Sequence, residues 1–511
     1  MELINKIKTN KDKILNVLSC IIFGGSLIYF ITMACKCASI PDFKDLHTYI
    51  YIALNILLLV GAYFIVRKIT TTNKWYITVL CLTIVLIVQI FSMKFQSIDY
   101  ILYLKNWTNA YRGQSLKDAL CLIDTTSNYM PAYNYFLILI AKLPVNDLFA
   151  IKFVSKVFEV ASSILIIYMI YKFTGDKVNI VVWLGILLVP AYLIETSFWG
   201  QCDAIYTFFN LLAIYYAINK KSKLSFAFFG VAFAFKMQSI LTFPIALILL
   251  LAKDEKGEHY LKWKDMWLTP LLFVLIDFIP VLAGESPLNI LKTYVAQASS
   301  EDRRYVGECA NIAMLLDMLF RVSIDSTIYK ILMPLSCILG ISVTAFLTVF
   351  MIKYQQKHKI TTSDVLFFLV CYCMLIVFTM PKMLDRFYYL ASLFALLYAF
   401  VKKDNFSRYL AMLILGAFSF SLCKFNYSGV TIFIFMIIAI LTMFLVATLI
   451  LTFFIKNYVN ESKNNLNDDE KFVDNNKLNQ EQIEKDDVVQ ECENEKINSK
   501  QENEITKVTV K

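Results

Sequence analysis

The chain has 511 residues, of which 58% are hydrophobic and 17% are charged, and its mean hydropathy is +0.60. This composition excludes a water-soluble globular protein. The net charge of +9 is spread between apolar runs, a pattern that favours membrane orientation over nucleic-acid binding. The twelve cysteines are scattered and the three histidines lie far apart, so neither a disulfide framework nor a metal site is predicted.

Apolar runs of roughly 20 residues recur along most of the chain, and each is long enough to cross a bilayer. The sequence therefore predicts an all-α polytopic membrane protein, a bundle of roughly 12–14 transmembrane helices with an outer-face loop carrying surface helices. The lysine-rich start is expected to be a retained span rather than a cleaved signal peptide. The expected spans are 14–34, 47–66, 75–93, 149–171, 178–194, 202–218, 224–235, 239–252, 267–283, 329–352, 363–380, 386–401, 408–423 and 429–455.

Loop charges predict the orientation of these spans, because lysine and arginine favour cytoplasmic loops. Every basic loop lies on the cytoplasmic side if the apolar segment 131–143 does not cross the membrane. That piece is too short to span, begins at Pro131 and is interrupted by Lys142, so we expect a helix on the outer surface of the bilayer. The polar segments expected to share the outer side are 94–148, 195–201, 236–238, 284–328, 381–386 and 424–428.

Four parts are expected. Residues 1–74 hold two N-terminal spans, 75–400 form the catalytic membrane core, 401–455 hold two C-terminal spans, and 456–511 form a charged cytoplasmic tail. The tail is rich in Asn, Glu, Lys, Gln and Asp, so it is too polar to bury a core and is predicted to be disordered.

Asp99 opens a long polar loop after a predicted span, and aromatic residues suited to an interface follow it. A carboxylate at the membrane surface can accept a proton from an acceptor hydroxyl, so Asp99 is the candidate general base. The alternative interpretation is a helix-capping or solvated loop aspartate.

Further polar groups interrupt apolar runs on the same predicted side. Trp199 and Gln201 are suited to stacking on a sugar and hydrogen-bonding it, and Asp203 and Tyr206 fall on one helix face. Ionisable groups in spans usually line a functional cavity, although an interfacial tryptophan before a polar helix start is a simpler explanation. The cations and their neighbours are Lys236 with Gln238, Lys382 with Asp385 and Arg386, and Arg303 in the 284–328 loop.

Each of these also has a simpler interpretation. Lys236 can extend to the lipid headgroups without a function, and Asp385 with Arg386 can form a structural pair that caps the next helix. The 284–328 loop is either a lid or a surface loop.

Together these residues resemble the GT-C superfamily of polytopic glycosyltransferases, and the bacterial branch related to glycosylphosphatidylinositol mannosyltransferase II in particular. The likeness covers about residues 75–400. It rests on Asp99 with Trp107 and Gly113, AsnTyrMetProAlaTyr (128–133), TrpGlyGlnCysAsp (199–203), PheLysMetGln (235–238) and LysMetLeuAspArgPheTyr (382–388). Two departures are Ala132, where relatives have a second proline, and Leu384 with Asp385, where relatives have His-Glu.

The resemblance implies a hexosyltransferase with a mannose-like sugar on a polyprenyl-phosphate donor, a glycan or lipid-linked acceptor, and inversion at the anomeric carbon. It implies that Asp99 is the base. The donor phosphate would meet Lys236, Lys382 and Arg386, with Arg112 and Arg303 in reserve, and no metal or other cofactor is expected. The sugar or acceptor would meet Trp107, Tyr129, Tyr133, Trp199, Gln201, Asp203, Tyr206, Gln238 and Asp385.

Two other functions are compatible with the same polar cavity. One is a transporter or flippase of lipid-linked sugars, which favours paired, Gly/Pro-interrupted halves that this sequence lacks. The other is an O-antigen-type polymerase. The Ile/Lys/Asn bias suggests an AT-rich bacterial genome, and so a plasma-membrane protein acting on a cell-envelope glycan at the extracytoplasmic face, with membrane lipids rather than nucleic acid as partners.

Overall fold

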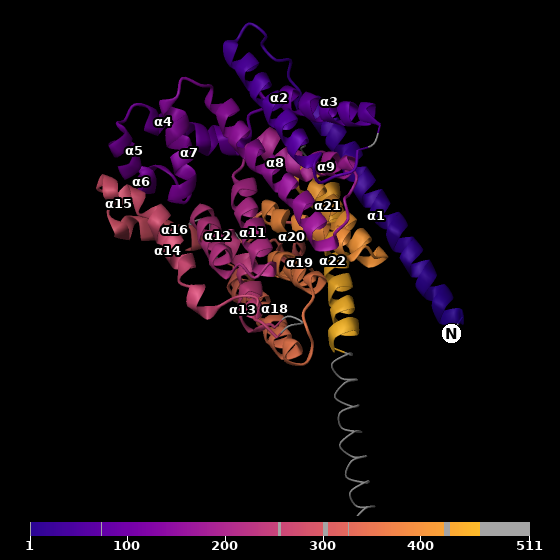
Figure 1. The fold of residues 1–511 in the computed structure, drawn as a ribbon. Coiled ribbons are helices and arrows are strands. Elements are labelled where there is room, and N and C mark those ends of the chain that lie inside the picture. The colour runs from indigo at the N-terminus through magenta and orange to yellow at the C-terminus, as the bar shows by residue number, and fades with distance from the viewer. Residues whose placement is uncertain are drawn as a thin grey trace, which may run out of the picture. The chain divides into compact units, whose positions relative to one another are not determined.

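A computed structural model describes residues 2–72, 74–253, 257–299, 305–324, 326–423 and 430–459. Within these ranges the secondary structure is helical, apart from two isolated β-bridges (Figure 1). The prediction of an all-α polytopic membrane protein is confirmed. The chain divides into two units, Met1–Leu449 and Ile450–Lys511, and the site described below lies in the first. Most of the predicted disordered tail, from residue 460 onward, lies outside the described residues.

Seven of the described helical segments are long and apolar enough to cross a membrane, and a bent pair makes an eighth candidate. Four shorter apolar helices of 10–17 residues accompany them. Fewer helices pass this length test than the number of spans predicted, because several predicted spans are short or broken; the chain bends by 51° between Ile180–Leu187 and Pro190–Trp199, for example. The seven are Asn10–Cys37, Leu46–Val66, Asp147–Thr174, Trp263–Ala283, Thr327–Lys357, Thr362–Thr379 and Phe433–Val459.

Each predicted span coincides with one helix or with a broken pair of helices. In chain order the α-helices are α1 (Glu2–Cys37), α2 (Leu46–Val66), α3 (Trp75–Phe91), α4 (Lys105–Arg112), α5 (Leu116–Cys121), α6 (Ile123–Thr126), α7 (Pro131–Lys142), α8 (Asp147–Thr174), α9 (Ile180–Leu187), α10 (Pro190–Leu193), α11 (Asp203–Ile218), α12 (Ser222–Phe235), α13 (Phe243–Leu251), α14 (Leu268–Asp277), α15 (Ile279–Ala283), α16 (Pro287–Ser299), α17 (Ile312–Phe320), α18 (Thr327–Lys357), α19 (Thr362–Thr379), α20 (Tyr388–Lys402), α21 (Asn405–Cys423) and α22 (Val430–Phe454).

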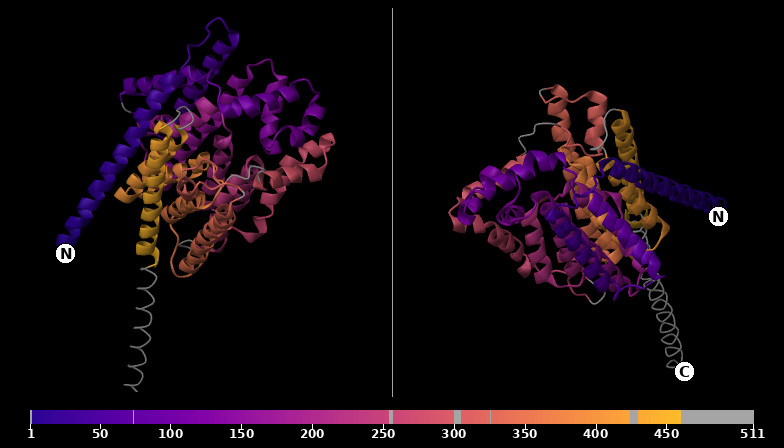
Figure 2. Two further views of the ribbon diagram at one scale, coloured as in Figure 1. Left: turned by 180° about the vertical axis from the view of Figure 1, so that it is seen from behind. Right: turned by 90° about the horizontal axis from the view of Figure 1, so that it is seen from above.

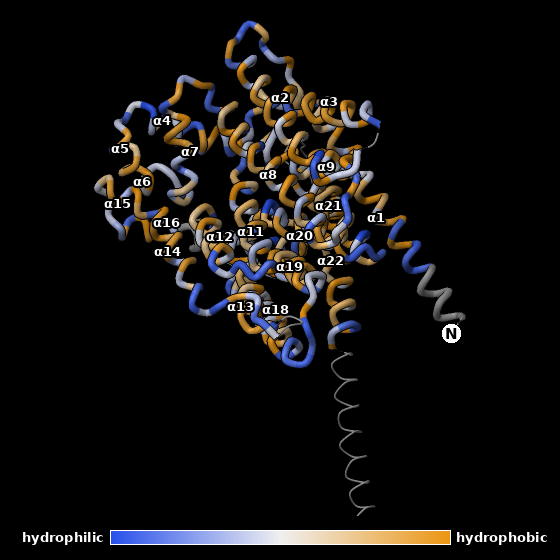
Figure 3. Tube along the Cα trace, viewed as in Figure 1, coloured by the Kyte–Doolittle hydropathy of each residue, from blue (hydrophilic) through white to orange (hydrophobic). Residues whose placement is uncertain are grey.

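Helix α8 is the central packing element of the first unit. It contacts α2, α7, α9, α11 and α20, while α1 packs against α21 although they come from opposite ends of the chain. Figures 1 and 2 show the indigo α1 running beside the orange α21. Figure 3 shows that α1 and α2 are largely hydrophobic, whereas the loops near α13 and α18 are hydrophilic. This is the pattern expected where helices lie in lipid and loops meet water.

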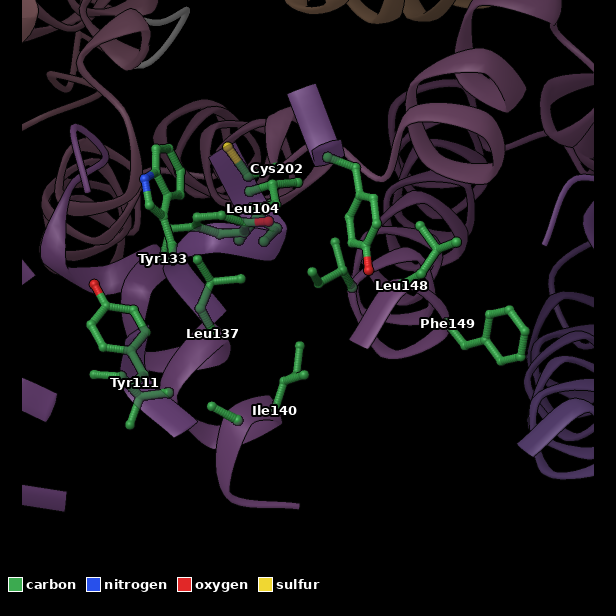
Figure 4. Packing of buried hydrophobic residues seen from close by; sticks show 14 of the residues in the cluster. Leu104, Tyr111, Tyr133, Leu137, Ile140, Leu148, Phe149 and Cys202 are labelled. Carbon is green, nitrogen blue, oxygen red and sulfur yellow. The ribbon is translucent and has the colours of Figure 1, made fainter. Parts of the chain in front are cut away.

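Helix α7 is the apolar piece that was predicted not to cross. It is a separate helix of 12 residues with a proline in its first turn, too short to span a bilayer. One face of it is buried in a hydrophobic cluster with α4 and α8, to which Tyr133, Leu137 and Leu148 contribute (Figure 4). The hydroxyl of Tyr111 also donates to Asn134 Oδ1 at 3.1 Å. These contacts fix the polar loop that carries Asp99 and Tyr129 against the bundle.

Loops predicted to lie on the cytoplasmic side contact one another. Lys177 donates from Nζ to the carbonyl of Lys68 at 3.1 Å, and Thr71 forms an isolated bridge with Asn179. Farther along the chain, the Tyr260 hydroxyl donates to the carbonyl of Ile360 at 2.9 Å. Each of these contacts joins two loops that the distribution of basic residues predicts to lie on the same side of the membrane.

Candidate active site

Asp99 lies between the end of α3 and a π-helix, Tyr100–Leu104. Its side chain is 34% exposed, so an acceptor can reach it from solvent. Its Oδ2 atom accepts a hydrogen bond from Arg386 Nη1 at 3.0 Å and another from Gln201 Nε2. The structure thus brings together three residues from the aspartate loop, the Trp-Gly-Gln segment and the late Asp-Arg motif.

Gln201 is held in place on both sides of its amide group. Its Oε1 atom accepts a hydrogen bond from the Tyr129 hydroxyl at 3.1 Å, while its Nε2 donates to Asp99. Burial raises the pKa of the Tyr129 phenol well above its ordinary value, although the charge of Arg386 works in the opposite direction. The phenol therefore stays protonated and can act as the donor. Tyr129, Gln201 and Asp99 form a continuous hydrogen-bonded chain.

Lys236 forms a buried ion pair with Asp203. Its Nζ lies 2.8 Å from both carboxylate oxygens, and the two side chains are 6% and 0% exposed. The helix break explains the position of Lys236, because α12 ends at Phe235 and Lys236 is extended before a 3₁₀ turn begins.

Arg386 connects the two carboxylates. Its Nη1 bonds to Asp99, and its Nε lies 3.8 Å from Asp203 Oδ2. The order Lys236, Asp203, Arg386, Asp99 is therefore a row of alternating charges. Asp385 accepts from the backbone N–H of Arg386 at 2.9 Å and so fixes the short 3₁₀ turn, Asp385–Phe387, that presents the guanidinium.

Aromatic rings surround this row of charges. The Lys236 ammonium lies 5.8 Å from the ring centre of Tyr129 and 5.6 Å from that of Tyr206. Tyr129 also makes edge contacts with Trp107 and Tyr133. Rings around a cation exclude water and strengthen its electrostatic interactions, and such rings also suit the apolar faces of a sugar.

Several buried polar atoms have no hydrogen-bond partner among the described residues. They include both carboxylate oxygens of Glu195, Ser197 Oγ and Gln238 Oε1. Buried polar groups are normally satisfied, so each such atom needs an explanation such as water or a ligand. Of these groups, the Glu195 carboxylate belongs to the site, because it lies beside the charges of Asp203 and Arg386.

Other candidates lie elsewhere. Arg112 forms an ion pair with Asp147 at the start of α8, so its charge is already matched there. Lys382 is partly exposed, has a positive φ of 57° and donates from its backbone N–H to the carbonyl of Tyr305 at 3.1 Å. Trp199 is buried, and its backbone carbonyl accepts from Ser97 Oγ at 3.3 Å. Arg303 lies outside the described residues.

Sequence reasoning did not select Glu195, although it is fully buried beside the Asp203 and Arg386 charges. It also missed the polar face of α8, where Lys152, Lys156 and Glu159 are all buried. The spacing of these three residues, i, i+4 and i+7 within a predicted span, is the signal that could have found them, because ionisable side chains inside a membrane are costly and need buried partners.

The comparison with known families covers part of this site. Residues 128–283 match a family model described as dolichyl-phosphate-mannose-protein mannosyltransferase. The matched segment is under a third of the chain; it includes Tyr129, Gln201, Asp203 and Lys236, but neither the Asp99 loop nor Arg386. No curated protein matches the sequence. The family match, together with the long apolar helices, supports a membrane glycosyltransferase of the GT-C superfamily.

Proposed function

We propose that this protein transfers a hexose, mannose-like in character, from a polyprenyl-phosphate donor to a glycan or lipid-linked acceptor. The observation that carries the proposal is the contact between Asp99 and Arg386, beside the buried Lys236–Asp203 pair. A partly exposed carboxylate next to fixed cations provides, within one site, a general base and positive charges that can stabilise the leaving phosphate. The family match supports mannosyl transfer in general terms.

In the proposed reaction Asp99 accepts the proton of the acceptor hydroxyl. The hydroxyl oxygen forms a bond to the anomeric carbon on the face opposite the phosphate, and the bond from that carbon to the phosphate oxygen breaks. Configuration at the anomeric carbon is inverted, and the polyprenyl phosphate leaves with the electron pair. Negative charge grows on the phosphate during this step, so nearby cations stabilise the transition state more than the ground state. Arg386 and Lys236 supply that charge.

The ion pair between Asp99 and Arg386 also has a role in this scheme. Arg386 and Gln201 both hydrogen-bond to Asp99. A donor phosphate that engages the guanidinium competes with Asp99 for it, because both are anions that suit the planar fork of arginine. Donor binding would then leave the carboxylate available to the acceptor hydroxyl.

We place the reaction at the extracytoplasmic face of a bacterial plasma membrane, on a cell-envelope glycan. The distribution of basic loops supports this side, and the predicted outer segments supply Asp99, Gln201, Lys236 and Arg386. The proposal needs no metal or other cofactor, because the two cations can carry out the charge stabilisation.

The test is transfer from a radiolabelled polyprenyl-phosphate hexose by purified protein in detergent or liposomes. Asp99→Asn should abolish transfer while donor lipid still binds, since the amide cannot accept the proton. Asp118→Asn is the matched control, because Asp118 is exposed in the same loop and bonds locally to Ser115. Transfer by Asp99→Asn at the normal rate would refute the assigned role. Movement of labelled lipid across liposomes without bond formation would instead favour a flippase.

A further inference from the structure

Lys152 is fully buried in the membrane-spanning helix α8, where it binds backbone carbonyl groups. Its Nζ donates to the carbonyls of Ser92 at 2.6 Å, Phe95 at 2.7 Å and Met93 at 3.4 Å. These carbonyls follow the C-terminal end of α3, where the helix dipole is negative and carbonyls lack helical partners. The lysine thus anchors the segment that leads directly to Asp99.

The same lysine also touches the other loop of the site. Gly200 has a φ of 67°, and a Cβ placed on it would lie 3.2 Å from Lys152 Cγ. Ser155, on the same face of α8, donates from Oγ to the carbonyl of Gln201 at 2.7 Å. Ser97 joins the two loops directly through its bond to the Trp199 carbonyl.

We propose that Lys152 is a positioning residue for the transferase reaction: it sets the distance between Asp99 and Gln201 by anchoring the Asp99 loop on α8. This inference rests on the proposed function of Asp99. A buried ammonium is costly inside a membrane and is usually retained for a function. Here the carbonyl of Phe95, which accepts a hydrogen bond from Lys152, lies four residues before Asp99. The Lys152 side chain also packs against Gly200, the residue before Gln201.

Lys156 offers an internal comparison. It is equally buried one turn farther along α8, but its Nζ bonds to the Tyr51 hydroxyl and, at 3.5 Å, to Asn55 Oδ1 and the Gln89 carbonyl. Those groups belong to α2 and to the last turn of α3, before the Asp99 segment. Loss of Lys156 therefore removes a buried lysine without releasing the loop that carries the base.

The test compares Lys152→Met with Lys156→Met in the full-length protein. Lys152→Met should lower kcat roughly 10- to 100-fold with little change in the donor KM, because small displacements of a catalytic group have effects of this size. Lys156→Met should keep kcat close to that of the parent. Lys152→Arg, which retains the charge, should recover part of the loss.

Hydrogen–deuterium exchange of the amides at residues 93–101 gives a readout independent of activity. Exchange there should rise in Lys152→Met and stay unchanged in Lys156→Met. If Lys152→Met does not fold, Lys152→Gln, which keeps a hydrogen-bond donor, replaces it in both measurements. Equal losses of kcat in the two lysine variants, or unchanged exchange at 93–101, would overturn the positioning role. Failure of the proposed function is seen separately, as full transfer by Asp99→Asn.

Discussion

Arg386 Nη1 lies 3.0 Å from Asp99 Oδ2, although 287 residues separate the two along the chain. The arginine comes from a short turn after α19, and the aspartate directly precedes the π-helix Tyr100–Leu104. The contact places a permanent cation against the group proposed as the general base. It also makes the guanidinium the link between the two carboxylates of the site.

Arg386→Lys should lower kcat/KM for transfer about 10- to 100-fold, less than the roughly 100- to 1,000-fold loss on complete removal of a stabilising donor, because lysine keeps the positive charge. Arginine reaches Asp99 with Nη1 and approaches Asp203 with Nε, whereas lysine is a single point charge and cannot serve both. Steady-state kinetics with labelled donor measures the effect. Arg408→Lys, at an exposed position in the first turn of α21 where the side chain bonds to the Asp404 carbonyl, should leave kcat/KM unchanged. Parent-like kinetics in Arg386→Lys would show that one contact is sufficient.

Loss of either partner of the buried Asp203–Lys236 ion pair should lower the free energy of unfolding. Removing one partner of such a pair typically costs about 3–5 kcal/mol, because the other charge is left buried and unmatched. We expect Asp203→Asn to destabilise the protein more than Lys236→Met, since Arg386 Nε is already within 3.8 Å of Asp203 and can move closer. Thermal unfolding in detergent measures both.

The double variant Asp203→Asn with Lys236→Met should regain part of the lost stability, because no unmatched charge remains from the pair. Strictly additive losses in the double variant would mean that the two side chains stabilise the fold independently.

Gly200→Ala should reduce transfer strongly. The left-handed backbone conformation at Gly200 is unfavourable for alanine. The added Cβ would also lie 3.2 Å from Lys152 Cγ and 3.3 Å from Ile151 Cγ2. The strain would shift Gln201 away from Asp99. Gly113→Ala is the control, because Gly113 has a φ of −79° and no neighbour within 4 Å of an added Cβ. Equal activity of the two variants would argue against a tightly held Gln201.

Transfer should survive EDTA. The charge on the leaving phosphate is met by Arg386 and Lys236 in the proposed mechanism, and these side chains lie together in the site. The measurement is initial rate before and after chelation and dialysis, followed by addition of Mg²⁺ or Mn²⁺. Loss of activity that a divalent cation restores would require a metal in the mechanism.

The sequence predicted much of the architecture because the dominant constraint is local. Each membrane-spanning segment must satisfy its own backbone hydrogen bonds, so length and hydropathy are enough to mark a helix. The same logic explains why the 131–143 piece was recognised as too short to cross. It also explains why site residues stood out, since Lys236 and Arg386 interrupt apolar runs at helix ends.

The partnerships within the site could not be predicted in the same way. Lys236 pairs with Asp203 and not with Asp99, and Arg112 pairs with Asp147 away from the site. Such choices depend on distances between helices that are remote in sequence. The polar face of α8 was overlooked because its apolar neighbours kept the predicted span intact.

The amino-acid sequence by itself determined the helical membrane architecture and the residue types available for chemistry, and it predicts one common side for the polar loops. Tertiary structure alone decided which carboxylate meets which cation, and that a buried lysine of α8 anchors the loop of the candidate base. The physical reason is that hydropathy acts residue by residue along the chain. Ion pairing instead depends on positions in space that only the packed bundle defines.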